Sequence, residues 1–135
     1  MECIDHIGVA VFDLDQSILA YQRDFGMKLD FREELPDRGV ALAFLSLRGS
    51  TTIELLAALN EKTVVKKFLD THGPGVHHIA YKVDDIAAEI LRLSALGHTP
   101  IDLQPRPGAR GSLIAFFGPK SLGGVLTELV QPAKR

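Results

Sequence analysis

The chain repeats one pattern of residues in its two halves. Residues 5–11 read DHIGVAV, and residues 77–83, which lie 72 positions further on, read HHIAYKV. A second match relates residues 53–56 (IELL) to residues 127–130 (TELV), 74 positions further on. Because a duplicated sequence builds the same structural unit twice, the chain is expected to contain two similar halves.

The repeat places one histidine and one glutamate of each half at equivalent positions. His6 precedes Glu54 by 48 residues, and His78 precedes Glu128 by 50 residues. If the two halves pack face to face, two imidazoles and two carboxylates converge. Such a set of nitrogen and oxygen donors is suited to a divalent metal ion.

Composition restricts the class of protein. The 135 residues, 46% hydrophobic and 24% charged, suit one packed domain or two small halves that share a core. The net charge of −2 gives no reason to expect nucleic acid or an anionic membrane as a partner. Cys3 is the single cysteine, so no intrachain disulfide can form, which is compatible with the cytoplasm. No leader, membrane-length apolar run, P-loop or nucleophile-elbow signature is found.

The first half is predicted to follow the order strand, helix, strand, strand, strand. Residues 4–11 alternate as in a strand, and Asp13 is a plausible N-cap for a helix that ends at Gly26. The predicted apolar stripe of this helix comprises Leu14, Ile18, Tyr21 and Phe25. The three later strands are expected near residues 28–34, 40–47 and 51–57. This first unit spans about residues 3–58.

The second half, about residues 76–131, is predicted to repeat that order after an inserted helix at about 62–72. The apolar side of the inserted helix is predicted to comprise Val64, Val65, Phe68 and Leu69. The later elements are expected as a strand at 76–83, a helix from an Asp85 cap to about Leu96, and strands near 99–103, 112–117 and 124–131. The Pro- and Gly-rich segment 104–111 reads either as a mobile lid or as a long turn.

Strand alternation separates the five histidines by role. His6 shares a face of its strand with Gly8 and Ala10, small residues that leave room beside the imidazole. His78 is in the equivalent position, whereas His77 must point to the opposite face. The remaining two, His72 and His98, lie near predicted helix ends and read as surface residues.

The two glutamates lie within apolar strands. A buried carboxylate costs several kcal/mol unless a cation or hydrogen bonds offset it. The alternative is that Glu54 and Glu128 point outward from half-exposed sheets, which would need no explanation. Together with the matched histidines, a metal site is favoured. These donors suit Co, Ni, Mn, Fe or Zn and leave up to two positions on an octahedral ion for a bidentate substrate.

Several segments resemble the vicinal oxygen chelate superfamily and, within it, the methylmalonyl-CoA epimerases. The resemblance runs nearly end to end and depends on residues 5–11, 33–36, 39–40, 53–56, 75–80 and 83–86, and most specifically on residues 105–109 and 119–131. It implies an α+β fold in which two tandem βαβββ units form a half-barrel around a metal held by His6, Glu54, His78 and Glu128. It also implies a cytoplasmic homodimer that uses one divalent ion, Co²⁺ first, and acts on a small acyl-CoA.

The same resemblance implies a reaction. An epimerase removes and returns the proton on the carbon alpha to the thioester, and Glu128 is the first candidate for proton transfer. Two positions depart from the epimerase pattern: Gly118 replaces a histidine, and Leu42 stands where some members carry an acid proposed as the second proton-transfer group. Glu33 and Glu34 are the next acids to consider. The alternatives are a glyoxalase I-type lyase and a non-catalytic ligand-binding member of the same fold.

Overall fold

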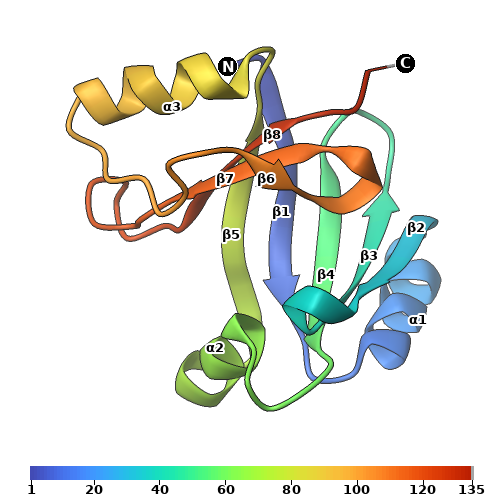
Figure 1. The fold of residues 1–135 in the computed structure, drawn as a ribbon. Helices are drawn as coiled ribbons and strands as arrows, with labels where there is room; N and C mark the ends of the chain where they lie inside the picture. The colour runs from blue at the N-terminus through green and yellow to red at the C-terminus, as the bar shows by residue number, and fades with distance from the viewer. Residues whose placement is uncertain (135) are drawn as a thin grey trace. The chain divides into compact units, whose positions relative to one another are not determined.

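The computed structural model describes residues 1–134 and contains the repeated order of elements (Figure 1). The elements of the first half are β1 (Cys3–Ala10), α1 (Leu14–Phe25), β2 (Lys28–Leu35), the 3₁₀ helix η1 (Pro36–Arg38), β3 (Val40–Ser46) and β4 (Thr52–Ala58). Helix α2 (Val64–His72) follows. The elements of the second half are β5 (Gly75–Lys82), α3 (Ile86–Ala95), β6 (Arg106–Pro107), the 3₁₀ helix η2 (Ala109–Gly111), β7 (Leu113–Phe117) and β8 (Thr127–Gln131). The predicted βαβββ repeat is confirmed.

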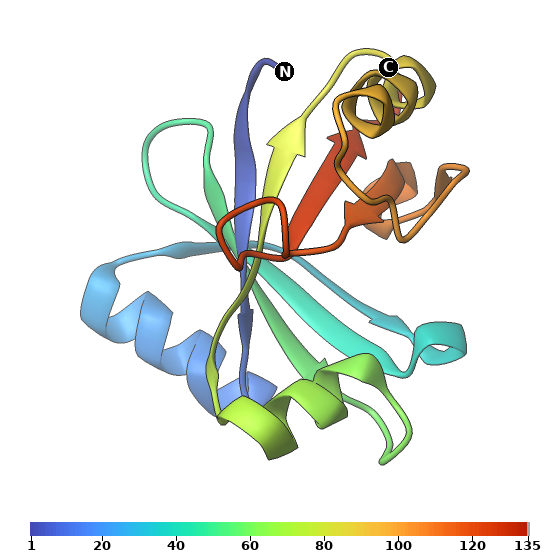
Figure 2. The same ribbon diagram turned by 90° about the vertical axis from the view of Figure 1, so that its left-hand side faces the viewer.

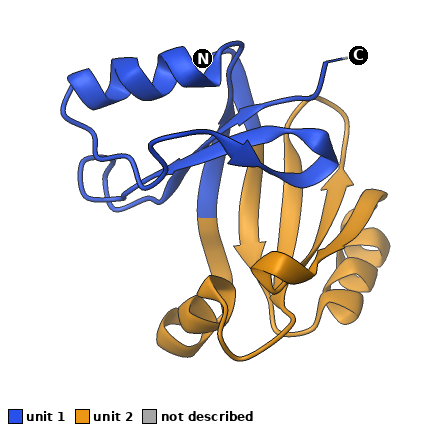
Figure 3. Cartoon of the chain, viewed as in Figure 1, with its two compact units in different colours: residues 1–5, 78–135 blue, residues 6–77 orange. Residues whose placement is uncertain are grey.

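The chain forms two compact units (Figure 3). One unit is His6–His77, and the other combines Met1–Asp5 with His78–Arg135. The first residues of β1 therefore belong with the second half of the chain. A backbone hydrogen bond of 2.9 Å, donated by the amide of Glu2 to the carbonyl of Lys82, illustrates this association.

The two units repeat one strand order. In His6–His77 the order is β2-β3-β4-β1, with β1 parallel to β4 and the other neighbours antiparallel (Figure 2, blue to green). In the other unit β5 is parallel to β8, and the antiparallel strands β7 and β6 follow. In each unit the strand that carries the candidate histidine therefore lies directly beside the strand that carries the candidate glutamate.

Helix α1 begins and ends where the sequence predicted. The side chain of Asp13 accepts a hydrogen bond of 3.0 Å from the amide of Gln16, and Gly26 ends the helix with a left-handed φ of 65°. Leu14 and Ile18 are buried against β3 and β4, and Tyr21 packs at the margin of this core. The prediction was wrong for Phe25, which lies in the last turn of the helix and is 67% exposed, with its ring tilted against that of Tyr21.

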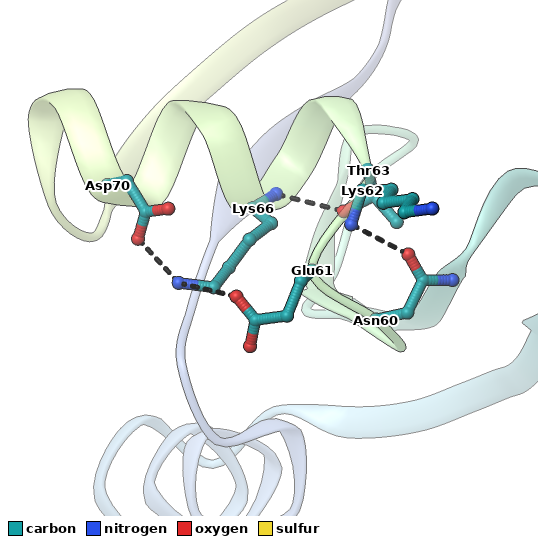
Figure 4. Close-up of polar contacts among 6 residues, drawn as sticks. All are labelled: Asn60, Glu61, Lys62, Thr63, Lys66 and Asp70. Carbon is teal, nitrogen blue, oxygen red and sulfur yellow. Dashed lines mark hydrogen bonds and ion pairs between the residues drawn. The ribbon is translucent and has the colours of Figure 1, made fainter.

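Helix α2 is fixed at its start by side-chain contacts (Figure 4). Thr63 is the N-cap and accepts a hydrogen bond of 3.0 Å from the amide of Lys66, whose ammonium group pairs with Glu61 and Asp70. Its inward face contains Val65 and Leu69, which are buried, together with the half-buried Phe68. The prediction was wrong for Val64, which is exposed. Val64 is the first residue of α2 and points away from the helix face that packs on β4.

Helix α3 packs on β7 and β8 in the same way as α1 packs in the other unit. Ile86 and Ile90 are buried with Val83, Phe117 and other apolar residues of the strands. The amide of Ile86 donates a hydrogen bond of 2.9 Å to the side chain of Gln131, which ties the start of the helix to the end of β8.

The N-cap of α3 provides a stability test. The side chain of Asp85 accepts a hydrogen bond of 3.1 Å from the amide of Ala88. Because the capping bond satisfies an otherwise unpaired helix amide, Asp85→Ala is expected to lower the free energy of unfolding by about 1 kcal/mol. Urea unfolding of the purified variant measures this change. The neighbouring exposed Asp84→Ala is the control and should stay within about 0.5 kcal/mol of the parent protein.

The edge strand of the second unit differs from the prediction. A strand was expected near residues 99–103, but the strand β6 is formed by Arg106 and Pro107, which pair with β7. Pro100 has no amide hydrogen and makes only an isolated bridge to Phe117. The amide of Phe116 on β7 donates a hydrogen bond of 2.8 Å to the side-chain carboxylate of Asp102. This side-chain bond takes the place of a backbone bond between β7 and a strand at residues 99–103.

No helix within residues 1–134 is long and apolar enough to cross a membrane. The longest, α1, has 12 residues.

Candidate metal centre and active site

His6 is held on the inward face of β1 by strand alternation. It shares that face with Gly8 and Ala10, and all three are buried, whereas the intervening Ile7 and Val9 are only partly buried. The parallel register aligns His6 with Thr52 and Gly8 with Glu54 on β4. Glycine at position 8 leaves the space beside Glu54 free of a side chain, so the imidazole and the carboxylate can approach one another.

Glu54 is buried and directed at His6. The carboxylate oxygen Oε1 of Glu54 lies 3.4 Å from the ring nitrogen Nε2 of His6. The alternative in which this glutamate points outward from a half-exposed sheet is wrong, since only 6% of its surface is accessible. The ring of Phe44, which is aligned with Glu54 on β3, meets the His6 ring edge to face at 5.3 Å.

The second unit contains the same arrangement. The Nε2 atom of His78 on β5 lies 3.3 Å from Oε2 of Glu128 on β8, and both residues are buried. Ala80 is aligned with Glu128, as Gly8 is aligned with Glu54. Phe116, aligned with Glu128 on β7, meets the His78 ring edge to face at 5.5 Å.

Phe44 and Phe116 are site residues that the sequence analysis missed. They are 72 positions apart, the same offset that relates His6 to His78, so a full comparison of the two halves could have found them. Each phenylalanine ring contacts an imidazole edge to face and places apolar surface beside the buried His–Glu pair. In such surroundings charge–charge interactions are stronger than in water.

The geometry of each His–Glu pair fits a divalent metal ion. A metal bound about 2.1 Å from a histidine nitrogen and from a carboxylate oxygen holds these atoms about 3.0–3.4 Å apart for bond angles between about 90° and 109°. The observed separations of 3.4 Å and 3.3 Å fall within or at the edge of that interval. The metal-free alternative for each unit is an ion pair between the carboxylate and a protonated imidazole. Metal analysis distinguishes the two.

The other histidines are placed elsewhere. His77 is only partly buried and contacts Phe68 of α2 edge to face at 5.0 Å. His72 stacks on Phe68 and is exposed, as predicted. His98 pairs with the hydroxyl of Ser121 at 2.8 Å and is partly buried.

The segment 104–111 of the second unit carries a cation on the same face as His78. Arg106 on β6 is paired with Asp102, with Nε 3.1 Å from Oδ1, and its guanidinium carbon lies 5.6 Å from the centre of the Phe116 ring. The amide of Gly108 donates a hydrogen bond to the carbonyl of Ser112. The hydroxyl of Ser112 donates a second hydrogen bond to the carbonyl of Ala109. These bonds agree with a structured turn, one of the two readings of this segment.

Comparison with known proteins gives the class. The family model described as Glyoxalase/Bleomycin resistance protein/Dioxygenase superfamily matches residues 5–116. The chain therefore belongs to this superfamily.

Within that superfamily the chain is similar to methylmalonyl-CoA epimerases along its whole length. The ethylmalonyl-CoA/methylmalonyl-CoA epimerase of Cereibacter sphaeroides is 35% identical, over 95% of this chain and 96% of the relative. The crystal structure of the Mycobacterium tuberculosis methylmalonyl-CoA epimerase is 41% identical with a TM-score of 0.93, over 98% of this chain and 89% of the other. A variant of the Streptomyces coelicolor methylmalonyl-CoA epimerase, solved with 2-nitronate-propionyl-CoA, is 37% identical with a TM-score of 0.94, over 98% and 96%. The resemblance found in the sequence is confirmed.

Proposed function

We propose that this protein is a metal-dependent epimerase that interconverts (R)- and (S)-methylmalonyl-CoA. The observation that carries the proposal is the repeated buried His–Glu pair, in a chain similar over its full length to methylmalonyl-CoA epimerases. A buried carboxylate is costly unless it is paired with a cation, and the same costly pair is present in both halves.

His6, Glu54, His78 and Glu128 are proposed to bind one divalent ion per chain. The two neutral imidazoles supply nitrogen donors, and the two carboxylates balance the charge of the ion. Nitrogen and oxygen donors without a thiolate suit Co²⁺, Mn²⁺, Ni²⁺ and Zn²⁺. The resemblance to the epimerases makes Co²⁺ the first candidate among them. The bound ion would supply Lewis-acid stabilisation of the enolate that forms when the α-proton leaves.

Glu128 is proposed to exchange the proton with the α-carbon. It is the glutamate within the sequence segment most particular to the epimerases, residues 119–131. The ring of Phe116 contacts the His78 ring and places apolar surface beside the His78–Glu128 pair. Binding to a cation weakens a carboxylate as a base, and therefore the role of Glu128 needs the separate test given in the Discussion.

The function is tested by incubating purified, metal-loaded protein with one epimer of methylmalonyl-CoA in deuterated water. Inversion at the α-carbon should be accompanied by deuterium incorporation, which nuclear magnetic resonance and mass spectrometry detect. A chelator should abolish both, and added Co²⁺ should restore them. Protein that leaves methylmalonyl-CoA unchanged but isomerises a glutathione hemithioacetal is instead a glyoxalase I-type lyase. Protein with no bound metal and neither activity is a ligand-binding member of the fold.

The remaining expectations from the resemblance extend this proposal. The substrate is expected to be a small-molecule acyl-CoA. The protein is expected to be a cytoplasmic homodimer and to bind neither nucleic acid nor membranes. Sedimentation equilibrium of the purified protein measures the oligomeric state.

A further inference from the structure

Arg106 carries a guanidinium group whose terminal donors are unused. Its side-chain contacts within residues 1–134 are an ion pair with Asp102, with Nε 3.1 Å from Oδ1, and the ring of Phe116, whose centre is 5.6 Å from the guanidinium carbon. Neither contact supplies a hydrogen-bond acceptor to the two terminal amino groups, Nη1 and Nη2, within this part of the chain. These groups belong to the planar fork with which arginine binds both oxygens of a carboxylate or phosphate.

Asp102 holds the guanidinium in one orientation. One of its carboxylate oxygens, Oδ2, accepts the amide hydrogen of Phe116 at 2.8 Å, and the other lies beside Nε of Arg106. The Asp102 side chain is only 17% exposed, and Nε itself is buried. An arginine that merely covers apolar surface needs no such carboxylate, fixed in place by a strand amide. The contact with Asp102 therefore positions the group and leaves Nη1 and Nη2 available.

The strands of this unit place Arg106 on the sheet face that carries the His78–Glu128 pair. Residues aligned across neighbouring strands point to the same side of a sheet. Phe116 is aligned with Glu128, and Arg106 is aligned with Ile114, two residues before Phe116 on the same face of β7. Helix α3 covers the opposite face. Because Phe116 also meets the His78 ring edge to face at 5.5 Å, a single aromatic ring separates the guanidinium from the imidazole.

The turn after β6 keeps Arg106 close to β7. A Cβ atom at Gly108 would lie 2.5 Å from a methyl carbon of Ile114 and 2.7 Å from the hydroxyl oxygen of Ser112, so a side chain there would force the turn away from the strand. The amide of Gly108 also donates a hydrogen bond of 2.9 Å to the carbonyl of Ser112. Arg106 is thus held on an ordered element, and a preorganised donor loses less conformational entropy when it binds a ligand.

The position of Arg106 favours the acyl end of a CoA thioester as its ligand. In the proposed reaction Glu128 exchanges a proton with the α-carbon, so the acyl group and its free carboxylate must lie beside the His78–Glu128 pair. The phosphates of CoA are at the far end of the pantetheine chain. A pair of donors that one aromatic ring separates from His78 is therefore placed for the acyl carboxylate rather than for a phosphate.

We propose that Arg106 binds the free carboxylate of the acyl group and thereby selects CoA thioesters that carry a carboxylate on the α-carbon. This inference rests on the proposed epimerase function and names the group that recognises its substrate class. Nη1 and Nη2 donate hydrogen bonds to the carboxylate, while Asp102 and Phe116 keep the guanidinium in place. A simple acyl-CoA such as propionyl-CoA offers no acceptor to these donors and binds without their contribution.

The test compares the binding of methylmalonyl-CoA with that of propionyl-CoA, which lacks only the carboxylate. Isothermal titration calorimetry uses the metal-loaded protein and an equimolar mixture of the two methylmalonyl-CoA epimers, so that no net conversion occurs. For Arg106→Gln, the dissociation constant of methylmalonyl-CoA should rise about 10–100-fold, the usual effect of losing a hydrogen bond to a charged group. The dissociation constant of propionyl-CoA should stay within about twofold of the parent value.

Two further variants make the test specific. Arg106→Lys keeps the charge without the planar fork, and its affinity for methylmalonyl-CoA should lie between those of the parent and Arg106→Gln. If Arg106→Gln does not fold, Arg106→Lys should still weaken methylmalonyl-CoA at least about threefold more than propionyl-CoA. Arg110→Gln is the matched control, because Arg110 is an exposed arginine of the same turn. It should leave both dissociation constants within about twofold, and metal content should be equal in all variants.

Two results would overturn the proposal. Equal weakening of both ligands in Arg106→Gln would mean that Arg106 contacts the CoA moiety or only supports the turn. Unchanged binding of methylmalonyl-CoA would mean that Arg106 does not contact the substrate. Either result, with a parent protein that inverts methylmalonyl-CoA, refutes this inference and leaves the proposed function standing. Failure of the parent protein itself to bind or invert methylmalonyl-CoA refutes the proposed function and this inference with it.

Discussion

Glu128→Gln is expected to lose about 10²–10⁴-fold of its turnover while it keeps a substantial fraction of its metal. The amide oxygen of glutamine can still coordinate a metal ion, but the amide cannot accept a proton at neutral pH. The loss is the typical contribution of one general base. Turnover per bound metal ion, with metal content measured by atomic emission, checks the prediction.

Glu54→Gln is the matched control, because the repeat gives Glu54 the same position in the other unit. Glu54 is a proposed metal ligand without a proposed proton-transfer role. Glu54→Gln should therefore lower metal content about as much as Glu128→Gln does, and it should lower turnover per bound metal ion much less. Near-normal turnover of Glu128→Gln with full metal would show that Glu128 is only a ligand. Equal loss of turnover per ion in both variants would refute the distinction between the two glutamates.

His78→Ala is expected to lower metal affinity by more than about 100-fold. Residues that only support a ligand typically contribute 10–100-fold to metal affinity, and loss of a direct ligand should exceed this. The substitution also leaves Glu128 buried beside a cavity, so some loss of stability is expected. Equilibrium dialysis against Co²⁺ measures affinity, and circular dichroism verifies that the variant is folded.

His77→Ala is the control for strand direction. His77 is adjacent in sequence but contacts Phe68 of α2, so its loss should leave metal affinity within about twofold of the parent. His6→Ala should match His78→Ala, because the repeat makes the two histidines equivalent. Equal loss of metal in His77→Ala and His78→Ala would contradict the assignment of faces.

Local features of the sequence predicted most of the elements because short-range physics determines them. Asp13 and Asp85 cap helices in the structure as predicted, since an N-cap depends only on residues three positions away. The alternation around His6 and His78 correctly separated His78 from His77, because adjacent residues in a strand must face opposite sides. The predictions failed where an element meets solvent: Phe25 and Val64 fit the helical stripe, but both lie at helix ends beyond the sheet.

By itself the sequence determined the duplication, the two βαβββ units and the His and Glu residues of each half, because periodicity and equivalent positions can be read along a chain. Only the tertiary structure decided that Glu54 and Glu128 are buried and lie 3.4 Å and 3.3 Å from their histidines. It also decided that β6 forms at Arg106–Pro107 and that Glu33 shares a sheet face with the His6–Glu54 pair. These features depend on register, which joins residues tens of positions apart, and a shift of one residue would turn every side chain of a strand to the opposite face.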